Sequence, residues 1–278
     1  MGLLGGTIGL AAKTRGLFRN VRGATSRKST LDIALRVGAI DTPCPTPEEA
    51  AKGADIVVVA TPVSSIPDMC IRCAPHAAPG ALITDVGSVK GMIDARLQGR
   101  MPETRTFIGS HPLAGSEKRG VVYANAGLLK GATCIITPGE DSNEEAVETL
   151  SQFWQALGMR VFSMPPNEHD TILASVSHVP HLAASAVLAA IPDAAMPFGA
   201  SGLKDTTRVA AGDPQLWRDI VEANQQEVLE ALENLAAQIQ VIRGRILRAD
   251  WEGVHQFLTE AAEKRRKRYP ENPEEIAQ

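Results

Sequence analysis

The sequence lacks an excess of basic residues, a long apolar run and a signal segment. Lys and Arg number 28 against 32 Asp and Glu, and this net charge of −4 argues against a nucleic-acid partner, which would need a basic face. No stretch of 18 or more apolar residues occurs, so no membrane span is expected. Lys13 and Arg15 follow the short apolar stretch at the N-terminus, whereas a signal peptide carries its charges in front. These absences predict a cytoplasmic protein.

Cysteine and metal-ligand clusters are also scarce. Of the four cysteines, Cys70 and Cys73 form a single CxxC, and no further pair of ligands stands nearby to complete a zinc site. His178 and His181 share one helical face, but the sequence places no carboxylate partner beside them. We therefore predict reduced thiols and no metal.

What is present in the first half is an alternation of strand and helix patterns. The clearest strand is 56–60, an unbroken apolar run of the kind found in buried parallel sheets. A helix over 30–37 ends at Gly38, and Ser142 with Glu145 forms a capping box for a helix that runs to Gly158. Weaker strand patterns occur at 21–24, 81–86, 106–108, 134–137 and 160–162. This alternation predicts a doubly wound α/β domain over residues 1–165.

The second half, residues 166–278, is predicted to be all-helical. Pro165 and Pro166 interrupt the pattern, and no convincing strand follows them. A buried helix is expected over 168–190, a long helix from Asp213–Pro214 to beyond Leu247, and a further helix over 251–268. The long helix carries an apolar stripe, which would face another helix of the same chain or of a partner subunit.

The chain opens with a glycine-rich turn, Gly2-Leu3-Leu4-Gly5, before an apolar helical pattern. In the GxGxxG turn of dinucleotide-binding folds, glycines let backbone N–H groups approach a pyrophosphate at a helix N-terminus. Gly2 and Gly5 fit the second and third glycines. The first glycine and the strand before it would lie upstream of Met1. We therefore expect an α/β domain lacking its first strand, and hypothesise a start upstream of residue 1.

Two further segments suit a dinucleotide. Thr61 and Pro62 follow the 56–60 strand, where a loop at the carboxyl edge of the sheet is expected. The second of these segments, around Ser26 and Arg27, follows the 21–24 strand pattern. It lacks the acidic residue that would bind a ribose 2′-hydroxyl. Because Ser26 and Arg27 suit a 2′-phosphate, NADP is slightly favoured over NAD.

Candidate chemistry lies in three segments. His111 lies in 109–118, interpreted as a loop of small residues after a strand, and a neutral imidazole there can accept a proton. Ser88, in 85–90, either binds the nicotinamide end or a substrate hydroxyl, or only caps the next helix with Lys90. Arg208 suits a carboxylate held by two hydrogen bonds, or is a surface residue of a helix.

Taken together and in order, six segments resemble the prephenate/arogenate dehydrogenase family of tyrosine biosynthesis. The resemblance runs from residue 2 to about residue 260. It implies a Rossmann-like domain that binds NAD(P) and a C-terminal helical dimerisation domain, and hence a homodimer. It also implies oxidative decarboxylation, in which a hydride goes to the nicotinamide and the ring loses carbon dioxide and becomes aromatic. The segments are GLLGGT, ADIVVVATPV, DVGSVK, GSHPLAGSEKRG, SHVPH and GLKDTTRVAAGDP.

The resemblance also implies roles for single residues. His111 would take the proton of the ring hydroxyl, with Ser88 close to it and to the cofactor. Arg208 would bind a carboxylate of the substrate. Other residues expected at the substrate pocket are His181, His178, Glu117, Lys204 and Asp205.

Three questions stay open at this point. One alternative is another two-domain dehydrogenase, which would act on a β-hydroxy acid and use a lysine of its helical domain. A second is a non-catalytic dinucleotide-binding dimer, although the joint presence of Ser88, His111 and Arg208 speaks against it. The choice between prephenate, which gives 4-hydroxyphenylpyruvate, and arogenate, which gives tyrosine, is also open, because the two substrates differ only in a keto or amino side chain.

Overall fold

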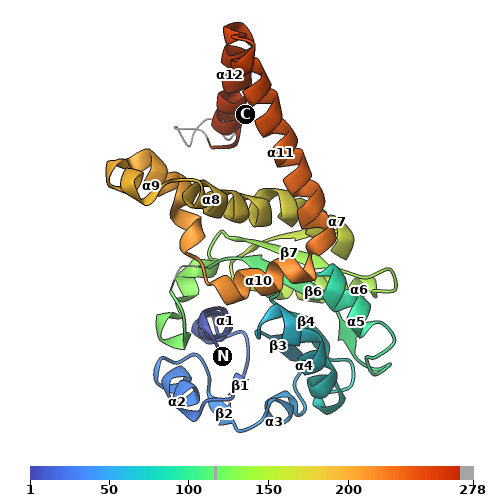
Figure 1. Ribbon diagram of the computed structural model, residues 1–278. Coiled ribbons are helices and arrows are strands. Elements are labelled where there is room, and N and C mark those ends of the chain that lie inside the picture. Colours follow the sequence, from blue (N-terminus) through green and yellow to red (C-terminus); the bar gives the residue numbers. More distant parts are fainter. Residues whose placement is uncertain (116–117, 270–278) are drawn as a thin grey trace. The chain divides into compact units, whose positions relative to one another are not determined.

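The computed structural model describes residues 1–115 and 118–269 (Figure 1). The chain divides into two compact units, residues 1–228 and 229–278. The first unit contains all the strands of the described residues and most of the helices. The domain boundary expected between residues 165 and 166 remains a prediction.

The strands form three small sheets in the described residues, mostly with parallel pairing. β1 pairs with β2, and β4 lies between β3 and β5, all in parallel. β7 lies between β6 and β8, antiparallel to β6 and parallel to β8. The strands are β1 (Arg22–Ala24), β2 (Thr42–Cys44), β3 (Ile56–Val59), β4 (Leu82–Asp85), β5 (Thr106–Phe107), β6 (Gly109–Leu113), β7 (Thr133–Thr137) and β8 (Arg160–Ser163).

Helices separate most of these strands in the first half, which confirms the predicted α/β class. They are α1 (Leu3–Thr14), α2 (Lys28–Arg36), α3 (Pro47–Ala51), α4 (Ile66–Cys73), α5 (Gly91–Leu97) and α6 (Glu144–Ala156). Gly38 and Gly158 have φ of +77° and +90°, as expected of glycines that end helices. The cap of α6 was predicted wrongly: Asn143, not Ser142, accepts the backbone N–H of Glu145.

A cleft of about 1200 Å³ lies between β1 and β3. In the described residues each of these strands is paired along one edge only, β1 with β2 and β3 with β4. Helix α1 is the first element of the chain, and its glycines let it pack closely. A side chain at Gly9 would come within 2.2 Å of the Ala39 carbonyl oxygen, and one at Gly5 would meet Ala60. The hypothesis of an upstream start remains a prediction.

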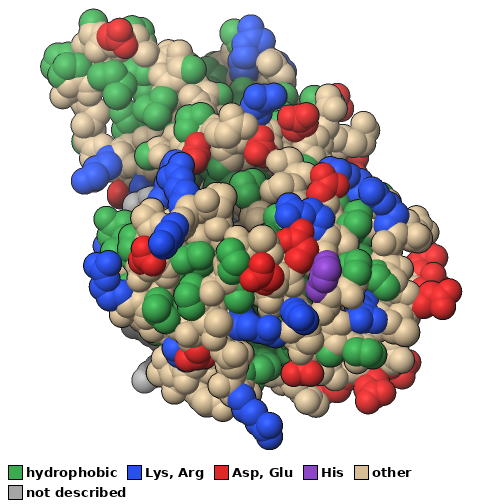
Figure 2. Space-filling view, turned by 90° about the horizontal axis from the view of Figure 1, so that it is seen from below, with side chains coloured by type: hydrophobic (Ala, Val, Ile, Leu, Met, Phe, Trp, Pro, Cys, Tyr) green, Lys and Arg blue, Asp and Glu red, His purple; other side chains and the backbone are tan. Residues whose placement is uncertain are grey.

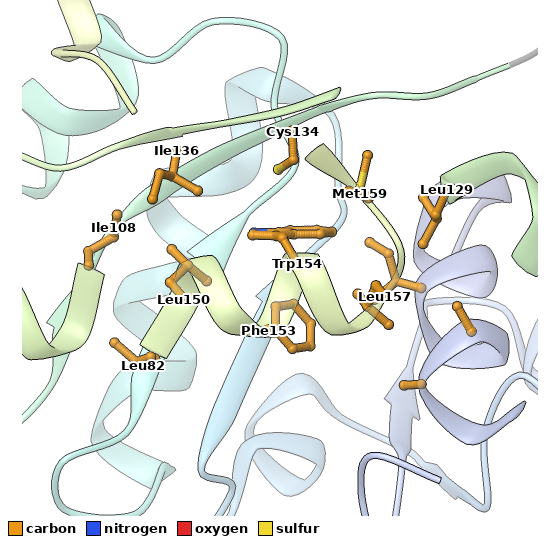
Figure 3. Close-up of a cluster of buried hydrophobic side chains, with 13 residues drawn as sticks. Leu82, Ile108, Leu129, Cys134, Ile136, Leu150, Phe153, Trp154, Leu157 and Met159 are labelled. Atoms are coloured by element: carbon orange, nitrogen blue, oxygen red, sulfur yellow. The ribbon is translucent and has the colours of Figure 1, made fainter. Parts of the chain in front are cut away.

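The main hydrophobic core lies between α1, α6 and the strands. Trp154 of α6 is fully buried at its centre, beside Leu150 and Phe153 (Figure 3). The indole Nε1 of Trp154 donates a hydrogen bond to the hydroxyl of Ser110 at 2.9 Å. Because Ser110 precedes His111 in β6, the core fixes this strand directly.

The second half contains only helices in its described part, as predicted. α7 (Pro166–Leu173), a π-helical turn (Ala174–His178) and α8 (Val179–Ala189) follow one another without a break, and α9 (Ser201–Thr207) comes next. The stretch Pro166–Ala189 is long and apolar enough to cross a membrane by length and composition, a test that core helices of soluble proteins also pass.

The long helix predicted from Asp213 is interrupted. Asp213 caps α10 (Pro214–Ala223) as expected, accepting the N–H of Gln215. The helix stops at Asn224, which leaves the helical conformation, and α11 (Gln225–Leu247) begins after it. The prediction that the helix passes Leu247 is wrong, because Ala249 has a positive φ of 50° and turns the chain into α12 (Trp251–Arg268).

Charged side chains of both signs are interspersed on the face shown in Figure 2. Lysines and arginines alternate there with acidic and hydrophobic side chains rather than forming one basic surface.

Candidate active site

His111 occupies the middle of strand β6, opposite Ile135 of β7. The expectation that His111 lies in a loop is therefore wrong: the backbone of 109–113 pairs with β7 in a regular ladder. The side chain is 9% exposed. A strand holds the imidazole more rigidly than a loop would, which suits a group that must meet a reacting atom at a fixed position.

A chain of buried hydrogen bonds runs from His111 to a carboxylate. Nδ1 of His111 lies 2.9 Å from Nε2 of His169, and Nδ1 of His169 lies 2.7 Å from Oδ1 of Asp170. His169 is fully buried and Asp170 is 5% exposed. The same carboxylate accepts the backbone N–H groups of Lys90 and Gly91, at 2.8 and 2.7 Å. Asp170, rather than the side chain of Ser88 or Lys90, therefore caps α5.

His111 is uncharged in this environment. Burial, reinforced by the nearby His169, Lys90 and His178, lowers the pKa of His111 well below the ordinary histidine value. A neutral imidazole has one nitrogen with a free lone pair. His111 can therefore accept a proton at neutral pH.

The loop that carries Ser88 is attached to strand β6 by a buried ion pair. Lys90 pairs with Asp85, and its Nζ donates to the Ser110 carbonyl oxygen at 2.8 Å. Asp85 accepts the N–H groups of Gly87 and Ser110. Ser88 is half-buried in this loop. The arrangement brings the segment that carries Ser88 and the strand that carries His111 together, and the role of Ser88 stays a prediction.

His178 and His181 both make ring contacts with Trp217. The His181 ring stacks on Trp217 with centroids 3.6 Å apart, and His178 meets the same indole edge-on at 6.2 Å. Burial lowers the pKa of both histidines, that of His178 to about 4. Asn224 Nδ2 lies 3.2 Å from Nδ1 of His178, and Nε2 of His178 is buried without a hydrogen-bond partner in the described residues. An unpaired buried ring nitrogen is available to a ligand.

The remaining residues expected at the substrate pocket lie elsewhere. Lys204 and Asp205 are exposed on α9, and Arg208 is exposed at the start of the 3₁₀ turn Arg208–Ala211. A pocket of about 320 Å³ beside His181 and Trp217 is not lined by any of these three residues. Glu117 lies outside the described residues. The substrate-binding roles of these four residues stay predictions.

The cleft between β1 and β3 fits a dinucleotide. Gly2 and Gly5 of the N-terminal turn line it, as do Ser26, Thr61 and Pro62, whereas Leu3, Leu4 and Arg27 do not. Gly2 precedes the first turn of α1, whose free N–H groups favour an anion. The hydroxyl of Thr61 is buried and has no hydrogen-bond partner in the described residues. An unsatisfied hydroxyl in the wall of the cleft is a natural contact for a polar ligand.

Sequence reasoning missed His169, Asp170 and the Asp85–Lys90 pair. A signal was present in the case of His169 and Asp170, since both polar residues lie near the start of the stretch 168–190, which the sequence predicts to be a buried helix. Buried polar groups need partners. This pair therefore pointed to a hydrogen-bonded site in the helix.

A dinucleotide cleft and a buried, uncharged histidine in the same α/β domain define the class: an oxidoreductase that uses a nicotinamide dinucleotide. Comparison with known proteins agrees. Residues 8–163 match the family described as "Prephenate dehydrogenase, nucleotide-binding domain", and residues 165–260 match "Prephenate dehydrogenase, dimerization domain".

Individual relatives support the same assignment. The chain is 31% identical over 272 residues to the prephenate dehydrogenase of Bacillus subtilis (strain 168), covering 95% of this chain and 73% of that protein. Among solved structures it is similar to a prephenate dehydrogenase of Aquifex aeolicus in complex with hydroxyphenyl propionate and NAD+, with a TM-score of 0.88, 28% identity and coverage of 96% and 95% of the two chains. An arogenate dehydrogenase of Synechocystis gives a TM-score of 0.83 at 27% identity, covering 96% of each chain.

The chain belongs to the prephenate dehydrogenase family. The fold class and the family expected from the sequence motifs are therefore confirmed.

Proposed function

We propose that this protein oxidises and decarboxylates prephenate or arogenate. The observation that carries the proposal is His111, a buried neutral histidine beside the Ser88 loop. The names of the relatives agree: they include prephenate, arogenate and cyclohexadienyl dehydrogenases.

The chemistry requires little beyond positioning and one proton acceptor. When bound, the cofactor accepts a hydride from the ring carbon that bears the hydroxyl group. His111 takes the hydroxyl proton as that carbon becomes a carbonyl. The ring carboxylate then leaves as carbon dioxide, and the electrons of the broken bond complete the aromatic ring. His111 returns its proton to the ring oxygen, so the histidine ends the cycle neutral, as it began.

The cofactor assignment rests on the cleft between β1 and β3. Ser26 lies in its wall, and Arg27, which is exposed, immediately precedes α2. A serine and an arginine at this point suit a 2′-phosphate, so we keep NADP as slightly favoured. The relative from Aquifex aeolicus was solved with NAD+. An assay with each dinucleotide decides between them.

We also propose a cytoplasmic homodimer formed through the C-terminal helices. The match of residues 165–260 to a dimerization domain supports it. The apolar stretch Pro166–Ala189 has only 33% of its most apolar window buried within the chain, which leaves apolar surface for a second subunit. Sedimentation equilibrium tests the proposal, with twice the 29.5 kDa chain mass as the expected result and the chain mass as the contradicting one.

A steady-state assay tests the activity. Prephenate and arogenate are each offered with NAD and with NADP, and both reduced nicotinamide and carbon dioxide are measured. Equal amounts of the two products from either substrate are expected. Turnover of a β-hydroxy acid without carbon dioxide would support the alternative dehydrogenase, and dinucleotide binding without any turnover would support the non-catalytic dimer.

A further inference from the structure

We propose that Asp170 fixes two histidines in opposite tautomers. At its free ring nitrogen His111 is then a hydrogen-bond acceptor, and His178 is a hydrogen-bond donor. Asp170 does so through two relays: its carboxylate acts through His169, and its backbone carbonyl acts through Asn224. His169, Asp170 and Asn224 are thus positioning residues. Their effect on turnover rests on the proposed function, whereas the tautomers themselves do not.

The first relay starts at the carboxylate of Asp170. Its two oxygens accept the backbone N–H groups of Lys90 and Gly91, which can only donate. Both oxygens are therefore used as acceptors, and a carboxylate in this role has no proton to donate. The Nδ1 of His169, 2.7 Å from Oδ1, must therefore carry a proton and donate it to this hydrogen bond.

The next link follows from the chemistry of the imidazole. A neutral His169 with its proton on Nδ1 presents a lone pair on Nε2. Nδ1 of His111, 2.9 Å away, then donates to that lone pair. His111 is left with a lone pair on Nε2. In water a neutral histidine prefers the other tautomer, with its proton on Nε2, so the relay reverses the ordinary preference.

The second relay starts at the backbone of the same residue. The Nδ2 group of Asn224 donates to the Asp170 carbonyl oxygen at 2.9 Å, which identifies that atom as the amide nitrogen. Its second hydrogen points to Nδ1 of His178 at 3.2 Å, so Nδ1 accepts and the proton of His178 sits on Nε2. That Nε2 is the buried, unpartnered nitrogen described above.

The two relays give the histidines complementary tasks. His111 can take a proton from a hydroxyl, and His178 can donate a hydrogen bond to an oxygen. Asp170 also holds the N-terminus of α5 and hence the end of the Ser88 loop. One residue of α7 therefore aligns the proton acceptor, a donor and the cofactor-side loop.

Long-range ¹H–¹⁵N NMR spectra of the full chain, labelled at histidine, read these tautomers directly. They are recorded without substrate at pH 8, above the ordinary pKa of histidine. The chain has six histidines, and the exposed His76 and His255 serve as references for free exchange. Single His→Gln variants assign the signals. We expect the proton of His111 on Nδ1 and that of His178 on Nε2. A His111 proton on Nε2 would overturn the proposal, whatever the enzyme turns over.

The variant Asp170→Asn tests the consequence for catalysis. An amide at this position can donate to His169, which pushes its proton to Nε2 and forces His111 into the opposite tautomer. We expect kcat to fall by up to roughly ten-thousandfold with KM nearly unchanged, the effect of replacing a carboxylate that orients a catalytic histidine. His169→Gln should act in the same direction, since it removes the imidazole relay.

The matched control is Asp94→Asn, a half-buried aspartate of α5 outside both relays. It should leave kcat and both tautomers unchanged. A folded Asp170→Asn protein that keeps the wild-type tautomer of His111 and the wild-type kcat would contradict the proposal. If Asp170→Asn does not fold, the NMR spectrum of the wild type still shows which ring nitrogen of His111 carries the proton. If no substrate is turned over, the proposed function is wrong. The tautomer assignment is then judged from the NMR spectrum alone.

Discussion

Lys90 and Asp85 form an ion pair that is shielded from water, with side-chain exposures of 1% and 0%. The pair links the end of β4 to β6, because Nζ of Lys90 also donates a hydrogen bond to the carbonyl oxygen of Ser110, next to His111. A buried charge is tolerated only while its partner remains in place. The position of the Ser88 loop relative to His111 therefore depends on this pair.

Replacing Lys90 by methionine should strongly destabilise the protein. The variant leaves the Asp85 carboxylate buried without its partner, and breaking such a pair costs about 3–5 kcal/mol. Urea denaturation measures the loss. Lys13→Met is the matched control, since Lys13 pairs with Asp41 in a partly exposed site and should lose at most about 1 kcal/mol. Equal losses in the two variants would show that burial of the pair is unimportant.

Acid should destabilise the fold through His178. Its pKa is about 4 in the folded protein and near 6.5 in the unfolded chain, so the unfolded chain binds the proton first as the pH falls. Above pH 6.5 the difference in pKa does not lower the free energy of unfolding, and below it the free energy of unfolding falls progressively toward pH 4. At about 1.4 kcal/mol per pKa unit the total is roughly 3 kcal/mol.

The measurement compares unfolding free energies of the wild type and His178→Gln between pH 7 and pH 4. The wild type should lose more stability, by roughly 3 kcal/mol, because glutamine does not titrate. His76→Gln, at an exposed position, should keep the wild-type pH dependence. Parallel curves for wild type and His178→Gln would mean that His178 binds its proton as readily in the folded state as in the unfolded chain.

Removing the guanidinium of Arg208 should weaken substrate binding. Loss of a charge-assisted contact costs about 2–5 kcal/mol when its partner stays buried, so Arg208→Ala should raise the substrate KM much more than it lowers kcat. Arg96→Ala, an exposed arginine of α5, is the control and should leave both parameters unchanged. An unchanged KM in Arg208→Ala would remove Arg208 from the carboxylate-binding role.

Thr61 should contribute to cofactor affinity through its hydroxyl. The oxygen is buried in the cleft wall without a partner in the described residues. A hydrogen bond gained from a ligand contributes about 0.5–1.5 kcal/mol. Thr61→Val should therefore raise the dinucleotide KM severalfold and leave the substrate KM unchanged. Thr14→Val is the control, because Thr14 is an exposed residue at the end of α1 whose hydroxyl donates to the Leu10 carbonyl oxygen. Equal cofactor KM values would contradict the contact.

Local signals predicted much of this fold. Periodicity located strands such as β3 and β4, and a cap residue located the start of α10, because these features depend on neighbours in sequence. The strand β6 was missed because Gly109 and Pro112 are poor strand formers, and pairing with β7 overrides that preference. The break at Asn224 was missed for a similar reason: its side chain is held by Asp170 and His178, which are distant in sequence.

The sequence predicts some of the residues that contribute to the site, but not the hydrogen bonds that join them. His111 and Ser88 stand in motifs that the sequence displays. The relay from His111 through His169 to Asp170 joins β6 to α7, and no spacing rule relates residues of two such elements. Such contacts exist only once the helices pack on the sheet.

His111 is the proton acceptor of the proposed reaction, and the steady-state kinetics of His111→Asn test that role most directly. Asparagine keeps the polarity and approximate size of the side chain but cannot take a proton at neutral pH. With the better of prephenate and arogenate, kcat should fall by roughly a hundredfold or more while the KM values stay within a few-fold of the wild type. A kcat within a few-fold of the wild type would contradict the account and favour a dehydrogenase whose proton acceptor lies elsewhere.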